Sequence, residues 1–204
     1  MRSRRLLVCG ALAGPTFVAV TGAQILSRRG FDLRRHGISL LSLGEGGWIQ
    51  VANFVLAGVL SLAFGQGVRQ VLPRRHPLLP ALVSGYGLGL VATGLFLVDP
   101  GAGFPPGTPD GLPANPSWHG AVHAAAPPAA FACLVGSCLL FSRRYARMGR
   151  PGWAAYSAAT GMVAGALIFW PGSAGSVRSA LAVLVTSTWT TAVAVQLLAE
   201  QRAS

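Results

Sequence analysis

The stretch DPGAGFPPGTPDGLPANPSWHGAVH, residues 99–123, is the longest interruption in an otherwise apolar chain. It is rich in proline and glycine and has no periodicity, so ordered secondary structure is not expected within it. It holds two of the five acidic residues and two of the four histidines. The long uncharged runs on both sides of it are typical of membrane helices.

The composition of the whole chain argues against a soluble domain. Its 204 residues are 52% hydrophobic and 10% charged, whereas soluble domains carry about 25% charged residues. The net charge of +11 would suit a nucleic-acid-binding protein. The arginines, however, cluster in short gaps between apolar runs, as topology signals do. We therefore expect the partner of this protein to be the lipid bilayer and not a nucleic acid.

Six apolar runs are each long enough to cross a hydrocarbon core of about 30 Å. They predict an all-α, polytopic integral membrane protein, a six-transmembrane-helix bundle that forms a single domain over residues 1–204. The predicted spans are residues 6–26, 47–68, 77–98, 119–141, 153–170 and 179–199. Tryptophans mark the expected membrane boundaries, because Trp48, Trp118 and Trp170 fall at predicted outer ends and Trp153 at an inner end.

The distribution of arginine predicts the orientation of the bundle. All 16 basic residues are arginine, a bias that indicates a GC-rich bacterial genome. With both termini in the cytoplasm, 11 of these arginines lie on the inner side of a plasma membrane. The strongest signal is the loop with Arg143, Arg144, Arg147 and Arg150. The other inner arginines are Arg2, Arg4, Arg5, Arg69, Arg74, Arg75 and Arg202.

The first loop, residues 27–46, is the exception, because it carries four arginines on the disfavoured outer side. Its arginines alternate with apolar residues, which predicts a segment that lies in the membrane interface with its arginines in water. Anionic lipid head groups are a further expected partner of such a segment.

Polar groups from four segments are predicted to gather at the outer end of the bundle. His119 and His123 are four residues apart at the start of the fourth helix, so both imidazoles lie on one face. Asp99 is expected to end the third helix at the same level. The candidate site is completed by Asn53, close to Gln50, and by Asp32, Arg35 and His36 of the first loop. The middle of the interruption, residues 102–115, is not expected to contribute.

Three interpretations of this site stay open. His119, His123, His36 and Asp99 could hold zinc, and a zinc-bound water could attack an outer-leaflet lipid, as in a metal-dependent hydrolase. The same groups could relay protons in a small proton-coupled transporter. In a structural role, Asp99 would pair with an arginine of the first loop and the histidines would bond to the backbone. We favour a non-enzymatic protein whose polar outer pocket meets a ligand or lipid or is structural, with no cofactor expected.

Glycines at GxxxG spacing predict close packing between helices. With 27 glycines in the chain, we expect these pairs to pack within the chain more than to form a dimer, and the oligomeric state is not predicted. The pairs are Gly10/Gly14, Gly85/Gly89 and Gly161/Gly165.

An ordered set of short motifs resembles the domain of unknown function 998 family, and the resemblance covers nearly the whole chain. It implies a multi-pass membrane protein of bacterial or archaeal type and names no activity. The matching residues are Gly14-Pro15, Arg29-Gly30-Phe31-Asp32, Arg35-His36, Ile38-Ser39, Gly47-Trp48, Gln50, Asn53-Phe54, Asp99-Pro100, His119-Gly120 with His123, and Trp153 with Tyr156-Ser157.

Overall fold

The computed structural model describes residues 2–72, 77–111, 113, 115–171 and 175–203, so Arg74 and Arg75 lie outside the described residues. Within these residues the chain forms helices and no β-strand. The helices are α1 (Arg2–Ser27), α2 (Gly47–Val71), α3 (Leu78–Leu95), α4 (Trp118–Arg147), α5 (Pro151–Phe169) and α6 (Gly175–Ala203), with a short 3-10 helix, η1 (Ile38–Ser42), between α1 and α2.

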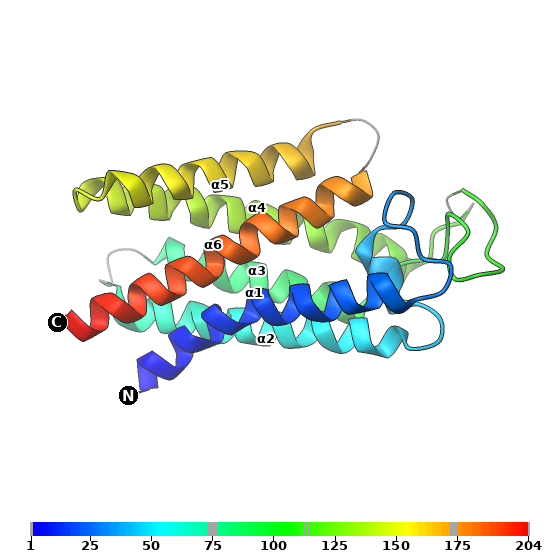
Figure 1. Ribbon diagram of the computed structural model, residues 1–204, viewed down its shortest axis with the longest axis horizontal. Coiled ribbons are helices and arrows are strands. Elements are labelled where there is room, and N and C mark those ends of the chain that lie inside the picture. Colours follow the sequence, from blue (N-terminus) through cyan, green and yellow to red (C-terminus); the bar gives the residue numbers. More distant parts are fainter. Residues whose placement is uncertain (1, 73–76, 112, 114, 172–174, 204) are drawn as a thin grey trace.

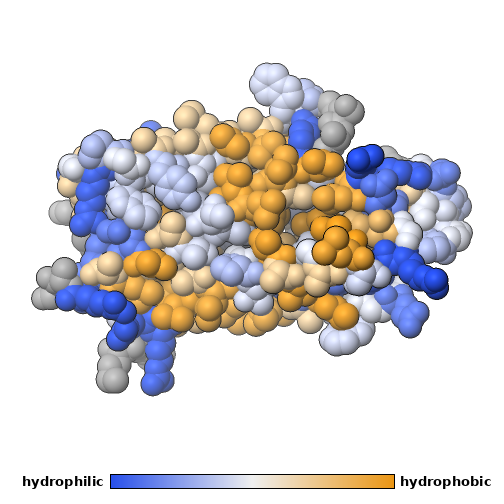
Figure 2. All heavy atoms as spheres, viewed as in Figure 1, coloured by the Kyte–Doolittle hydropathy of each residue, from blue (hydrophilic) through white to orange (hydrophobic). Residues whose placement is uncertain are grey.

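All six long helices of the described chain are long and apolar enough to cross a membrane. The predicted all-α, six-helix membrane fold is therefore confirmed. Figure 2 shows a broad band of hydrophobic side chains over the middle of the visible face, with hydrophilic residues gathered toward both ends. Such a band is what a surface in contact with lipid requires, because hydrocarbon offers no hydrogen-bonding partner.

The helices form a closed ring in which each packs against the next along the chain and α6 returns to α1. Both termini lie at one end of the bundle, and the two long loops, residues 28–46 and 96–117, lie at the other (Figure 1). We call these the terminal end and the cap end. Trp48, Trp118 and Trp170 are 65–73% exposed near the cap end, as an aromatic belt at one membrane surface requires.

The third helix ends earlier than the predicted span, at Leu95 rather than at residue 98. Phe96 already has extended backbone, so Asp99 lies beyond the helix end and not within it. The carbonyl of Phe96 is bonded by the imidazole of His123 from α4 at 2.7 Å. The hydrogen bond from His123 satisfies a backbone carbonyl near the end of α3. The sequence of the third apolar run alone does not predict this bond.

The first loop, which its alternating pattern predicts to lie in the membrane interface, folds over the end of the bundle. Its residues Ile38, Leu40 and Leu41 are buried, and η1 packs on α1 and α2. The loop closes over the end of the bundle because apolar side chains gain more from the protein interior than from the polar interface. Together with residues 101–111 of the second long loop it forms the structure that we call the cap.

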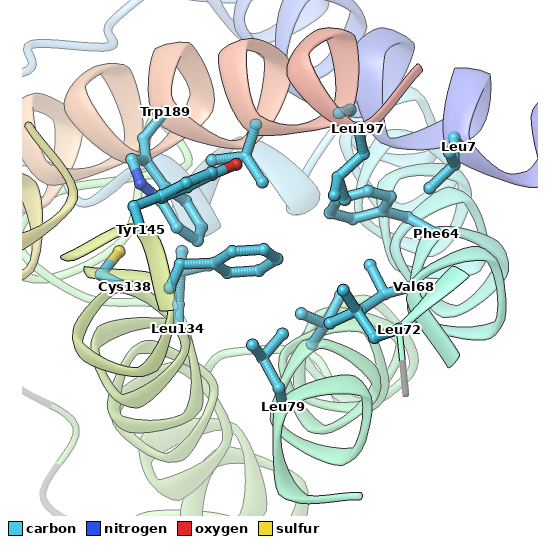
Figure 3. Packing of buried hydrophobic residues seen from close by; sticks show 14 of the residues in the cluster. Leu7, Phe64, Val68, Leu72, Leu79, Leu134, Cys138, Tyr145, Trp189 and Leu197 are labelled. Carbon is cyan, nitrogen blue, oxygen red and sulfur yellow. The ribbon is translucent and has the colours of Figure 1, made fainter. Parts of the chain in front are cut away.

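The interior of the bundle differs between its two halves. On α2, Gln50 and Asn53 are buried toward the cap end, while Phe64 and Val68 are buried toward the terminal end. The terminal half is filled by what we call the apolar core, which includes Phe64, Leu134, Tyr145, Trp189 and Leu197 (Figure 3). The buried polar side chains that could meet a ligand therefore concentrate in the cap half.

Candidate functional site

His36 is the centre of the cap, and both of its ring nitrogens are engaged. The backbone N–H of Asp32 donates to Nδ1 at 2.9 Å, so Nε2 carries the proton and donates to the carbonyl of Ala102 at 3.0 Å. The ring is 3% exposed and lies 5.3 Å from the ring of Phe104. A neutral histidine bonded in this way has no free lone pair for a metal, so its role is to join the two loops.

The middle of the second loop contributes to the cap, contrary to expectation. Phe104 is 1% exposed and packs edge-on against Phe31. The guanidinium of Arg28 lies 5.7 Å from the centre of the Phe104 ring and donates to the carbonyls of Leu41 and Leu43. Proline and glycine prevent regular structure here, but the buried aromatic ring still packs this part of the loop against the first loop.

Arg35 pairs with Asp110 at 2.7 Å, and this ion pair also joins the two loops. The two side chains are 57% and 82% exposed, and an exposed pair of this kind contributes about 0–1 kcal/mol. The predicted pair between Asp99 and an arginine of the first loop is not found. Asp99 instead accepts a hydrogen bond from the backbone N–H of Ser117, next to the start of α4.

The carboxylate of Asp99 accepts a hydrogen bond at the start of α4. The backbone N–H of Ser117 donates to its Oδ2 at 2.8 Å, and the Ser117 side chain in turn accepts from the N–H of Gly120. The hydrogen bonds from Ser117 hold the pKa of the Asp99 carboxyl below its usual value, because they favour the charged form. A Cβ at position 120 would lie 2.0 Å from Oδ2, so any larger residue there would displace the carboxylate from this position.

The two histidines of α4 lie in different environments. His119 is exposed and its ring packs at an angle of 34° against that of Trp118, with ring centroids 3.6 Å apart. His123 is 4% exposed, and its Nδ1 donates to the carbonyl of Phe96, which leaves Nε2 buried without a partner. Among the described residues, no three side chains of His, Cys, Asp or Glu are grouped so that they could hold a metal ion.

Asn53 belongs to a separate group between α1 and α2, which we call the amide cluster. It consists of Thr21 and Gln24 near the end of α1 and of Gln50 and Asn53 near the start of α2, all at most 5% exposed. Each pair is spaced i, i+3 and so lies on one helix face. Because the two helices are consecutive and antiparallel, their polar faces meet just below the cap.

Hydrogen bonds connect all four side chains of the amide cluster. Gln24 Nε2 donates to Gln50 Oε1 at 2.7 Å, and Gln50 Nε2 donates to Thr21 Oγ1 at 3.2 Å. Asn53 Nδ2 donates to Thr21 Oγ1 and to the carbonyl of Phe17, each at 3.1 Å. Two acceptors are left over, since Gln24 Oε1 and Asn53 Oδ1 are buried without a partner. A buried acceptor in that state costs about 1–3 kcal/mol.

The predicted site residues therefore lie in three places and not in one. Asp32, Arg35 and His36 build the cap; Asp99, His119 and His123 lie at the junction of α3 and α4; Asn53 belongs to the amide cluster. Thr21 and Gln24 were missed by sequence reasoning. Their i, i+3 spacing, opposite the same spacing of Gln50 and Asn53 in the next helix, is a signal that could have found them.

The arginines that were expected to set the orientation differ in their contacts at the terminal end. Arg143 and Arg147 are exposed. Arg144 and Arg150 both bind the carboxylate of Glu200, at 2.9 and 2.6 Å, and Gln196 donates to the same carboxylate. This group joins the ends of α4 and α6 to the start of α5.

Comparisons with known proteins identify the family of the chain. Comparison with curated proteins and with solved structures finds no match. A family model described as a protein of unknown function, DUF998, matches residues 11–196, which include all three groups of polar side chains. A match over so much of the chain confirms the resemblance that the sequence motifs indicated, and the chain belongs to the DUF998 family.

Proposed function

We propose that this protein is a non-enzymatic membrane protein that binds a small, neutral, hydrogen-bond-donating ligand in the cap half of its bundle. The observation that carries the proposal is the pair of buried, unpartnered oxygens, Gln24 Oε1 and Asn53 Oδ1. A ligand with N–H or O–H groups would satisfy both acceptors and would remove the free-energy cost of leaving them unbonded.

The chemistry of the amide cluster favours a neutral ligand. All four side chains are uncharged, and none of their hydrogen bonds involves an ionised group. A charged ligand at this depth would need a countercharge, because an isolated charge within a bilayer is costly. Amides and hydroxyls instead discriminate by hydrogen-bond geometry, as polar groups in binding pockets do.

The other two interpretations receive less support from the described residues. A metal-dependent hydrolase needs Asp99, His119 and His123 around one open position, whereas His119 packs against Trp118 and His123 bonds to backbone. A transporter needs a polar path to both membrane surfaces, whereas large apolar side chains fill the terminal half (Figure 3). Binding at one end of the bundle is the function that fits this arrangement.

We also propose that the cap end faces the outside of a bacterial plasma membrane and that both termini are cytoplasmic. The excess of arginine toward the terminal end supports this orientation. In a cysteine-free background, Asp110→Cys should react with a membrane-impermeant maleimide in intact cells, because the Asp110 side chain is 82% exposed. Arg147→Cys, also exposed but at the other end, should react only after permeabilisation. The reverse pattern of labelling would invert the proposed orientation.

Ligand binding can be tested with acetamide, which has two N–H donors, and with N,N-dimethylacetamide, which has none. We expect acetamide to raise the Tm of the protein in lipid nanodiscs in a concentration-dependent manner, because a ligand that binds only the folded state stabilises it. N,N-dimethylacetamide at the same concentration should not raise the Tm, because it cannot donate to Gln24 Oε1 or Asn53 Oδ1.

Matched variants assign the effect to the amide cluster. Gln24→Leu combined with Asn53→Leu should abolish the response to acetamide. Gln66→Leu, which changes an exposed glutamine of α2, should keep it. If the two amides shift the Tm equally, if neither shifts it, or if the double variant still responds, the cluster is structural and the proposal fails.

A further inference from the structure

A cavity of about 10 Å³ lies between α1, α2, α3 and α6, near the middle of each helix. Its walls include Gly14 and Phe17 of α1, Ala57 and Ser61 of α2, Tyr86 of α3 and Thr190 of α6. About this much volume accommodates one water molecule. The cavity is separate from the amide cluster, although Phe17 lines it with its side chain and accepts from Asn53 with its carbonyl.

The hydroxyls around the cavity leave unused hydrogen-bonding capacity. Ser61 donates to the carbonyl of Ala57 at 2.8 Å, and Thr190 donates to the carbonyl of Thr186 at 2.9 Å. Each of these oxygens keeps lone pairs with which it can accept a hydrogen bond from a molecule in the cavity. The hydroxyl of Tyr86 makes no hydrogen bond to any described residue, so it remains as a donor.

These two acceptors and one donor define the kind of molecule that fits the cavity. It must be the size of water, donate two hydrogen bonds and accept one. It must also be neutral, because no ionised side chain lines the cavity and a charge at the centre of a bilayer is costly. An apolar molecule such as a lipid tail would leave the Tyr86 hydroxyl unsatisfied.

We infer that this cavity is a binding site for one neutral, water-sized, hydrogen-bonding molecule, for which water itself has the matching donors and acceptor. The bound molecule joins Ser61, Tyr86 and Thr190 and so links α2, α3 and α6 in the middle of the bundle. The site uses none of the hydrogen-bonding side chains of the amide cluster. If no ligand binds to the amide cluster, the inference about this cavity is therefore unaffected.

The sign of a stability change tests this inference. If the cavity is occupied, Tyr86→Phe removes the donor to the bound molecule and should lower the Tm in nanodiscs by about 2–4 °C. If the cavity is empty, the same change removes a hydroxyl that has no hydrogen-bond partner and should leave the Tm unchanged or raise it. Tyr156→Phe, which changes a tyrosine of α5 that is 37% exposed, is the control for the substitution itself.

A second pair of variants addresses the acceptor side. Thr190→Val should lower the Tm more than Thr188→Val, because Thr188 also bonds to its own helix but is exposed. A crystal structure that resolves water should show one molecule within hydrogen-bonding distance of Ser61, Tyr86 and Thr190. A Tm that rises or stays constant in Tyr86→Phe, equal effects of the two threonine variants, or an empty cavity would each overturn the inference.

Discussion

Replacement of Gly58 by alanine is expected to lower the free energy of unfolding by about 1–3 kcal/mol, because the packing between α2 and α3 leaves no room for a methyl group. A Cβ at position 58 would lie 2.7 Å from the carbonyl oxygen of Gly87 and 2.6 Å from Val91 Cγ2. The reciprocal contact is as close, since a Cβ at Gly87 would lie 2.8 Å from the carbonyl oxygen of Gly58. Backbone cannot yield as a flexible side chain does, so the two helices must separate.

Gly22 provides the matched control for this substitution. It also lies within a helix, but a Cβ there would meet nothing within 4 Å. Gly22→Ala should be neutral or stabilising by up to about 1 kcal/mol, because alanine is the better helix former. Titration with sodium dodecyl sulfate or thermal unfolding in nanodiscs measures both variants. Equal effects of the two substitutions would contradict the close approach of α2 and α3.

Glu200→Gln is expected to destabilise the protein by about 1–3 kcal/mol, because it leaves Arg144 and Arg150 without their shared carboxylate. Removing one partner of a fully buried ion pair would cost more, but the side chains of Glu200 and Arg144 are 18% and 20% exposed and that of Arg150 is 38% exposed. The loss should appear as a lower Tm and as loosened contacts among α4, α5 and α6 at the terminal end.

Glu45 is a suitable control because it is an exposed glutamate of the cap, so Glu45→Gln should change the Tm little. A double-mutant cycle between Glu200→Leu and Arg144→Leu should give a coupling energy larger than measurement error. If Glu200→Gln behaves like Glu45→Gln and the coupling is absent, solvent screens these ion pairs and they do not hold the helices together.

The glycines show which helix contacts a GxxxG motif predicts and which it does not. The GxxxG pairs do pack within the chain, as expected: a Cβ at Gly10 would meet Phe64, one at Gly89 would meet Ala130 and one at Gly161 would meet Cys138. The close backbone contact between Gly58 and Gly87, however, involves no GxxxG pair. Its two members are on different helices, and nothing in either helix alone shows that they face each other.

The histidines show a similar limit. The expectation that His36 and His123 could bond to backbone is met at Ala102 and Phe96. The expectation that they share one site with Asp99 is not, because the cap and the α3–α4 junction are separate places. The helix ends predict a shared membrane depth for these residues, but depth does not determine which way each helix is rotated.

The sequence by itself determined the number of helices, their approximate ends and the membrane character of the surface. Each of these depends on the length of an uncharged run relative to the bilayer thickness, which is a local property. Only the tertiary structure decided the partners of individual side chains: that Gln24 meets Gln50, that Glu200 binds two arginines and that Phe104 packs against Phe31. Those contacts depend on helix rotation and loop closure, which are set by packing among segments far apart in the chain.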